Sequence, residues 1–81
     1  MVRVLLFGRL RDVAGWRERA VDPPPATLFA LKNQLTAEDP ALGEALAAAG
    51  VQAAVDRALV RGDTPLAAGA EVAFLSPMSG G

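Results

Sequence analysis

A run of three prolines, Pro23, Pro24 and Pro25, limits the possible folds of this chain more than any other feature. Proline lacks an amide hydrogen and holds φ near about −65°, so the run can continue neither the interior of a sheet nor a helix. It must therefore be a connection. The residues before it have the pattern of strands, and those directly after it have the pattern of a helix.

Two strands are predicted before the prolines. Val2–Phe7 is apolar except for Arg3 and contains β-branched and aromatic residues, which indicates a strand. Residues 16–21 alternate bulky or apolar with charged side chains, which favours an edge strand that pairs back on the first. Residues 9–15 between them are expected to form either a loop or one helical turn.

Two helices are predicted after the prolines. Thr27 is a good N-cap for an amphipathic helix that runs to about residue 37. Its apolar stripe has the spacing i, i+3, i+7 and consists of Leu28, Leu31 and Leu35. A second, alanine-rich helix is expected to start with Asp39 as N-cap and Pro40 as the first helical residue, and to stop at Gly50.

Three further strands are predicted at residues 51–55, 58–61 and 72–75, with turns at Asp56 and Arg57, at residues 62–65 and at Gly69. The main helix thus lies between an N-terminal pair of strands and a C-terminal group of strands. This order predicts the α+β class, with one sheet packed on one main helix and a second short helix. We expect a single domain over residues 1–81, with residues 76–81 as a flexible C-terminal arm.

Alternation along the strands divides the sheet into two faces. One set is apolar and should meet the helix: Val2, Val4, Leu6, Ala58, Val60, Val72 and Phe74. The other set mixes arginine with large apolar residues: Arg3, Leu5, Phe7, Arg57, Leu59, Arg61 and Leu75. A single helix covers only one face, so the second set should face solvent or a partner. Phe7, Leu59 and Leu75 together predict a protein–protein site, although isolated exposed leucines are common on any surface.

The residue types exclude most catalytic chemistry. The chain has no cysteine and no histidine, which excludes disulfides, thiolate chemistry, zinc clusters and Ser-His or Cys-His pairs. No glycine-rich turn precedes a Lys-Ser/Thr pair, so no phosphate loop is predicted. The nine acidic residues are scattered, as expected of a solvated surface. Arg9 and Arg11 could bind an anion or a partner's carboxylates, or could be ordinary surface charge.

Charge and hydropathy limit the partners and the location. Eight basic and nine acidic residues give a formal net charge of -1, which argues against nucleic acid as a partner. There is no signal-peptide pattern and no long apolar run, so we expect no membrane association and a cytoplasmic location.

The sequence closes on Gly80 and Gly81, shortly after a predicted strand and Pro77. Glycine has no Cβ, so a Gly-Gly arm could pass through a slot too narrow for any side chain. Such an arm would suit a protein whose terminal carboxyl group is itself the reactive group. An end without a role is the alternative.

Together these features resemble the ubiquitin-like β-grasp sulfur carriers, and closely the family of molybdopterin synthase small subunits. The resemblance spans nearly the whole chain and is most specific in residues 69–81, GAEVAFLSPMSGG. The segments VLLFGRLRDVAG, from Val4, and AAVDRALV, from Ala53, are also similar. The chain departs from the family's tendencies at Asp56 (asparagine), Ala70 (an acidic residue) and Ser76 (proline).

The resemblance implies a mixed sheet and a carrier that is not itself an enzyme and holds no cofactor or metal. An ATP-dependent, E1-like activating enzyme would adenylate Gly81, and a sulfurtransferase would supply sulfur to form a thiocarboxylate there. The carrier would then dock on the large subunit of molybdopterin synthase and donate sulfur to the cyclic pterin precursor. Glycine at Gly80 would let the arm lie flat. The implied partner contacts are Phe7, Arg11, Leu59, Leu75, Pro77, Met78 and Ser79.

Other functions remain open at this stage. The same terminal chemistry would serve a sulfur carrier for thiamine synthesis or tRNA thiolation. A ubiquitin-like modifier would instead be conjugated to lysines through Gly81. A plain interaction domain would use neither.

Overall fold

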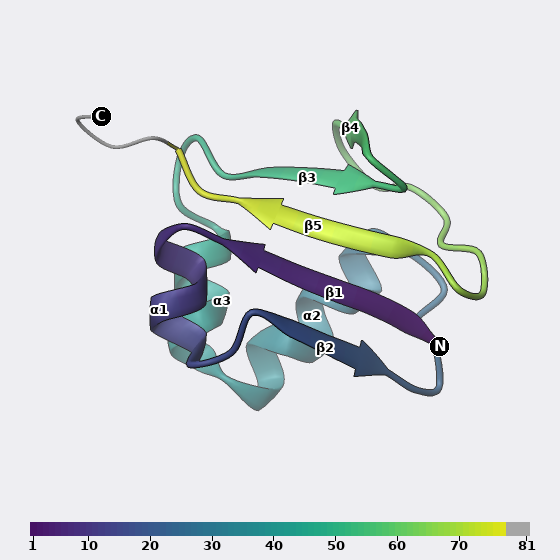
Figure 1. Ribbon diagram of the computed structural model, residues 1–81, viewed down its shortest axis with the longest axis horizontal. Helices are drawn as coiled ribbons and strands as arrows, with labels where there is room; N and C mark the ends of the chain where they lie inside the picture. The colour runs from purple at the N-terminus through teal and green to yellow at the C-terminus, as the bar shows by residue number, and fades with distance from the viewer. Residues whose placement is uncertain (78–81) are drawn as a thin grey trace.

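The sheet is mixed and has five strands in the order β2-β1-β5-β3-β4 (Figure 1). The computed structural model describes residues 1–77 of the chain. The strands are β1 (Val2–Phe7), β2 (Glu18–Val21), β3 (Gln52–Val55), β4 (Ala58–Val60) and β5 (Glu71–Leu75). β1 and β5 run parallel at the centre, and the three other pairings are antiparallel. The first strand and the last described strand therefore lie side by side, and β2 is an edge strand as predicted.

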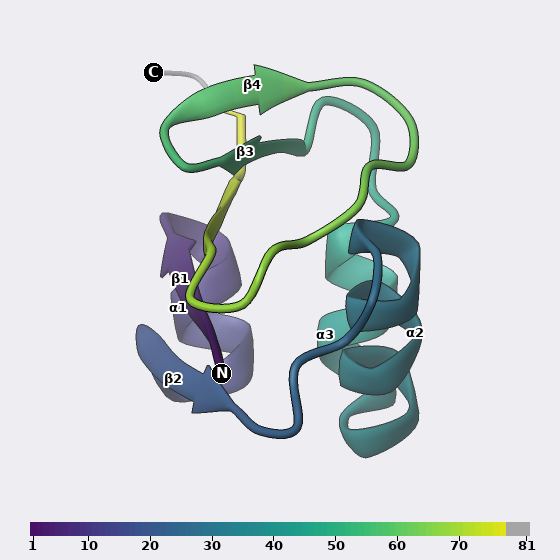
Figure 2. The ribbon, with the colours of Figure 1, turned by 90° about the vertical axis from the view of Figure 1, so that its right-hand side faces the viewer.

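Within residues 1–77, three helices complete the fold: α1 (Arg9–Ala14), α2 (Leu28–Glu38) and α3 (Pro40–Leu46). α2 and α3 lie behind the sheet in Figure 1 and beside it in the turned view of Figure 2, so they cover one face and leave the other open. α1 packs against α3 at the end of β1. The predicted α+β class and the two faces of the central strands are confirmed.

The helix starts follow local capping rules. The Thr27 side chain accepts a hydrogen bond from the Ala30 amide at 3.1 Å, and Asp39 Oδ1 accepts one from the Leu42 amide at 3.2 Å. Pro40 stands in the first turn of α3, where its missing amide hydrogen costs nothing. Both predicted helix starts are confirmed.

Two helical details differ from the sequence expectation. Residues 9–15 are neither a loop nor a single turn, because they form the six-residue helix α1, ended by Gly15 at φ 82°. α3 ends at Leu46 and does not continue to Gly50. There the Ala47 amide bonds to the carbonyls of Gly43 and Glu44, and a tight turn follows. That turn brings the chain back toward the sheet, so Gly50, at φ 86°, belongs to the connection into β3.

The core lies between the sheet and the helices. It joins the inward residues of the strands to the leucines of all three helices: Val2, Val4, Leu6, Leu10, Val21, Leu28, Leu31, Leu35, Leu42, Leu46, Ala53, Leu66, Ala70, Val72 and Phe74. No charged or polar side chain is buried within residues 1–77. The i, i+3, i+7 leucines of α2 are buried as predicted.

The β3–β4 turn depends on two residues with left-handed backbones, Asp56 at φ 49° and Arg57 at φ 71°. Positive φ at both central residues is the geometry of a type I′ hairpin turn, which matches the twist of the flanking strands. Asp56 Oδ1 also accepts a hydrogen bond from the Glu71 amide at 3.0 Å. The aspartate therefore ties the β3–β4 hairpin to the start of β5.

Candidate functional site

The open face of the sheet carries an apolar row set by the strand register. Leu5 is paired with Ala73, Ala73 with Ala54, and Ala54 with Leu59. Ala54 is buried although neither α2 nor α3 covers this face, and its side chain is only a methyl group. The two alanines at the centre of the row therefore project less from the sheet than the leucine at each end.

Phe7 and Leu75 lie next to each other one step further along the same face. Phe7 is 46% exposed and Leu59 64%, which are high values for large apolar side chains, whereas Leu75 is half-buried. We call Leu5, Phe7, Leu59, Ala73 and Leu75 the open-face patch. The structure thus brings the three predicted contact residues onto one uncovered surface, with β3 between Leu59 and Leu75.

The arginines around this patch are arranged differently from the expectation. Arg3 is on the open face but forms an ion pair with Glu18 at 3.3 Å, and both side chains are about half exposed. Arg57 and Arg61 lie outside β4, which spans only Ala58–Val60. Strand alternation therefore does not determine which face they occupy. Arg11 is exposed on α1 and is not part of the patch.

The root of the C-terminal arm, Ser76 and Pro77, is held against the loops at the end of the sheet. Ser76 Oγ accepts a hydrogen bond from the Arg9 amide at 3.1 Å and donates one to the Phe7 carbonyl at 3.3 Å. Pro77 lies next to Gly50, in the connection from α3 to β3. The arm therefore leaves β5 from the same end of the sheet where Phe7 and Leu75 lie.

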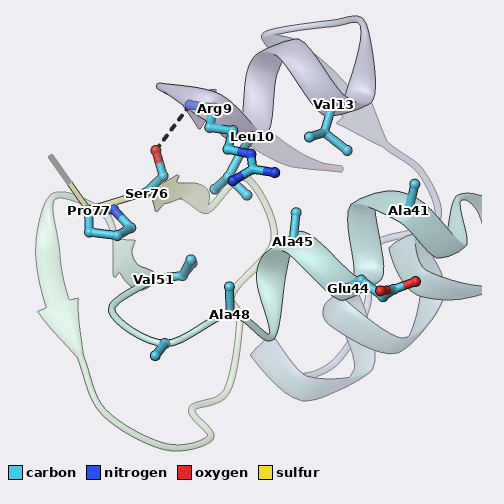
Figure 3. Close-up of a pocket in the computed structure, with 11 residues that line it drawn as sticks. Arg9, Leu10, Val13, Ala41, Glu44, Ala45, Ala48, Val51, Ser76 and Pro77 are labelled. Carbon is cyan, nitrogen blue, oxygen red and sulfur yellow. Dashed lines mark hydrogen bonds between the residues drawn. The ribbon is translucent and has the colours of Figure 1, made fainter. Parts of the chain in front are cut away.

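A groove of about 540 Å³ opens beside this root, on the helical side of the molecule (Figure 3). α1 forms one wall, and α3 with the turn after it forms another. The lining is mostly small or apolar, with one charged residue from each wall: Arg9, Leu10, Val13, Ala41, Glu44, Ala45, Ala48, Ala49, Val51, Ser76 and Pro77.

Some predicted site residues lie outside the described part of the chain: Met78, Ser79, Gly80 and Gly81. Conversely, sequence reasoning treated Ser76 only as a departure from a family tendency and missed its two hydrogen bonds. A serine with no strand or cap role, placed directly after a predicted strand, was the available signal. Its partners are 67 and 69 positions away, which no local pattern reveals.

Over residues 1–77, no group of three histidine, cysteine, aspartate or glutamate side chains is placed to hold a metal ion. No helix in that range is long and apolar enough to cross a membrane. What the described residues offer is an exposed apolar surface at the end of the sheet where Ser76 and Pro77 follow β5.

A mixed five-stranded sheet that clasps a helix on one face is the β-grasp architecture of ubiquitin-like proteins, and solved structures agree. The crystal structure of SAMP1 from Haloferax volcanii matches with a TM-score of 0.83 and 28% identity, covering 99% of this chain and 98% of that one. The solution structure of small archaeal modifier protein 1 from Methanosarcina acetivorans matches with a TM-score of 0.82 and 25% identity, covering 99% and 95%.

The sequence comparisons define the family. The ThiS family model matches residues 4–81. The molybdopterin synthase sulfur carrier subunit of Escherichia coli (strain K12) is 36% identical over 81 residues, covering 100% of both chains. The chain belongs to the ThiS family, and the predicted resemblance is confirmed.

Proposed function

We propose that this protein is a sulfur carrier, and specifically the small, non-catalytic subunit of a molybdopterin synthase. The observation that carries the proposal is the match with the E. coli sulfur carrier subunit over the full length of both chains. The family match also runs to residue 81, so it includes Gly80 and Gly81. These two residues are the reactive end in this proposal.

Gly81 must be activated by another enzyme, because an ionised carboxylate is a poor electrophile. In an E1-like activating enzyme, a carboxylate oxygen of Gly81 attacks the α-phosphorus of ATP and pyrophosphate leaves. The outer sulfur of a sulfurtransferase persulfide then attacks the acyl carbon and displaces AMP. A second thiol cleaves the sulfur–sulfur bond and is oxidised to a disulfide, which leaves Gly81 as a thiocarboxylate.

The carrier then docks on the large subunit and delivers this sulfur to the pterin precursor. We assign the docking to the open-face patch, since Phe7 and Leu59 are large, apolar and exposed on the face that no helix covers. Arg11, Pro77, Met78 and Ser79 are proposed as further contacts around the arm. Gly80 and Gly81 carry no side chain that would obstruct entry into a narrow active site.

A second function, conjugation to other proteins, is favoured by one observation. Both solved structures reported above are small archaeal modifier proteins, and they cover nearly the whole chain. In that case Gly81 would form an amide bond with a lysine of the target after the same adenylation step.

Intact-mass spectrometry of protein from its native cell tests both functions. The proposed carrier gives a species in which sulfur replaces one oxygen at Gly81, and this species disappears when the activating enzyme is deleted. Lysine conjugates without any thiocarboxylate would support the modifier. Removal of Gly81 is the control, because it must abolish either product. Sulfur transfer that survives this removal would exclude both functions.

A further inference from the structure

The arm root passes between two glycines from different loops. Gly8, in the β1–α1 connection, lies against Ser76, and a Cβ there would collide with Ser76 Oγ. Gly50, in the connection from α3 to β3, lies against Pro77, and a Cβ there would be 3.2 Å from Pro77 Cγ. The two loops and the arm root thus meet where β5 ends.

The other left-handed glycines of the described chain show that this contact is specific. Gly8 and Gly50 have φ of 62° and 86°. Three more glycines have positive φ, namely Gly15, Gly62 and Gly69, and a Cβ at any of these would meet nothing within 4 Å. Their backbone conformation alone explains them. At positions 8 and 50, the missing side chain also makes the space that the arm root occupies.

Ser76 adds hydrogen bonds to this contact. Its hydroxyl joins the Phe7 carbonyl to the Arg9 amide, so it bonds to both residues that flank Gly8 (Figure 3 shows the bond to Arg9). Arg9 is the first residue of α1, where an amide has no partner within the helix. Ser76 therefore satisfies that amide and at the same time holds the arm root to the end of β1.

We propose that Gly8, Gly50, Ser76 and Pro77 form a clamp that sets the direction in which the arm leaves the sheet, and that Ser76 is a positioning residue for sulfur transfer. The role in transfer rests on the proposed function, whereas the clamp itself does not. An arm whose first two residues are already ordered loses less conformational entropy when it enters a partner's active site. The clamp thus raises the fraction of docked carriers with a productively placed end.

The clamp is tested first in the free protein, by hydrogen exchange. Replacing Ser76→Ala removes the acceptor of the Arg9 amide, which should then exchange on the order of tenfold faster or more. Amides in β5 should be unaffected, since they bond within the sheet. Unchanged exchange at Arg9 would show that the hydrogen bond does not form, and would overturn the clamp.

A double-mutant cycle tests the steric part. Gly8→Ala should lower the thermal midpoint for two reasons: the strain of a side chain at φ 62° and ψ −137°, and the collision with Ser76 Oγ. In the Ser76→Ala background the Ser76 oxygen is gone and only the strain remains, so the loss from Gly8→Ala should be smaller than in the wild-type background. Equal losses from Gly8→Ala in the two backgrounds would contradict the contact.

Sulfur transfer is the last test, with thiocarboxylated carrier and saturating large subunit from the same cell. Ser76→Ala should slow single-turnover transfer roughly tenfold, the factor that corresponds to about 1.4 kcal/mol. The Kd for the large subunit should change less than about twofold, because docking uses the open-face patch. Altered Kd with unchanged transfer would refute the positioning role. If no carrier variant transfers sulfur, the proposed function fails, and the exchange and stability results still decide the clamp.

Discussion

Phe7→Ala should weaken docking on the large subunit without unfolding the carrier. Phe7 is 46% exposed in the free protein. A phenylalanine residue has roughly 200 Å² of accessible surface, so roughly 90 Å² of Phe7 is still open to solvent. At about 25 cal/mol per Å², complete burial of this area in a complex contributes about 2 kcal/mol. Since alanine retains part of that contact, we expect Kd to rise about tenfold to thirtyfold.

Phe29→Ala is a matched control. Phe29 is 47% exposed, nearly the same as Phe7, but it lies on α2 and therefore on the helical side of the molecule. The two changes remove the same atoms from equally exposed positions. Only the change at Phe7 should affect docking.

Isothermal titration calorimetry with the purified large subunit measures both variants. The Phe7→Ala complex should also show a less negative heat-capacity change, since less apolar surface is buried. Thermal melts should place both free variants within about 1 kcal/mol of the wild type, as is usual for exposed positions. Equal loss of affinity in the two variants, or a Phe7→Ala Kd within twofold of the wild type, would refute the assignment of the open-face patch.

Substitutions at three further positions test contacts that stabilise the fold, and urea denaturation measures the free energy of unfolding of each variant. Asp39→Ala removes the acceptor for the Leu42 amide at the start of α3 and should cost about 1 kcal/mol; no loss would mean that the cap is dispensable. Gly43→Ala places a methyl group against Thr36, which faces it from α2, and should cost about 1–3 kcal/mol despite the better helix propensity of alanine; stabilisation would show that the helices can separate. Asp56→Ala removes the bond to β5 and leaves a side chain at positive φ, so it should cost about 2 kcal/mol, whereas Asp56→Asn should cost less than half of that.

The elements that local chemistry determines were predictable from the sequence. α2 was predictable because an N-cap threonine and three leucines at helical spacing act within one segment. The strand faces were predictable for β1 and β5, where alternation extends over the whole strand. Strand alternation could not assign a face to Arg57 and Arg61, because both residues lie outside β4, which has only three residues.

What the sequence could not provide depends on contacts between distant residues. The parallel pairing of β1 with β5 is a tertiary register that no local pattern encodes. α3 ends at Leu46, where the chain turns back to the sheet, although a glycine such as Gly50 is a typical signal for the end of a helix. The clamp joins Ser76 to residues near the other end of the chain, and so it was missed.

The parallel pairing of β1 and β5 has a mechanical consequence. The chain enters the sheet at one end of β1 and leaves it at the opposite end of β5. A force that pulls the arm away from the N-terminus therefore loads the hydrogen bonds between these two strands in shear, all at once. An antiparallel pair pulled from the same end would instead open one bond at a time. The central strand pair should therefore resist a pull between the N-terminus and the end of β5 better than an antiparallel pair would.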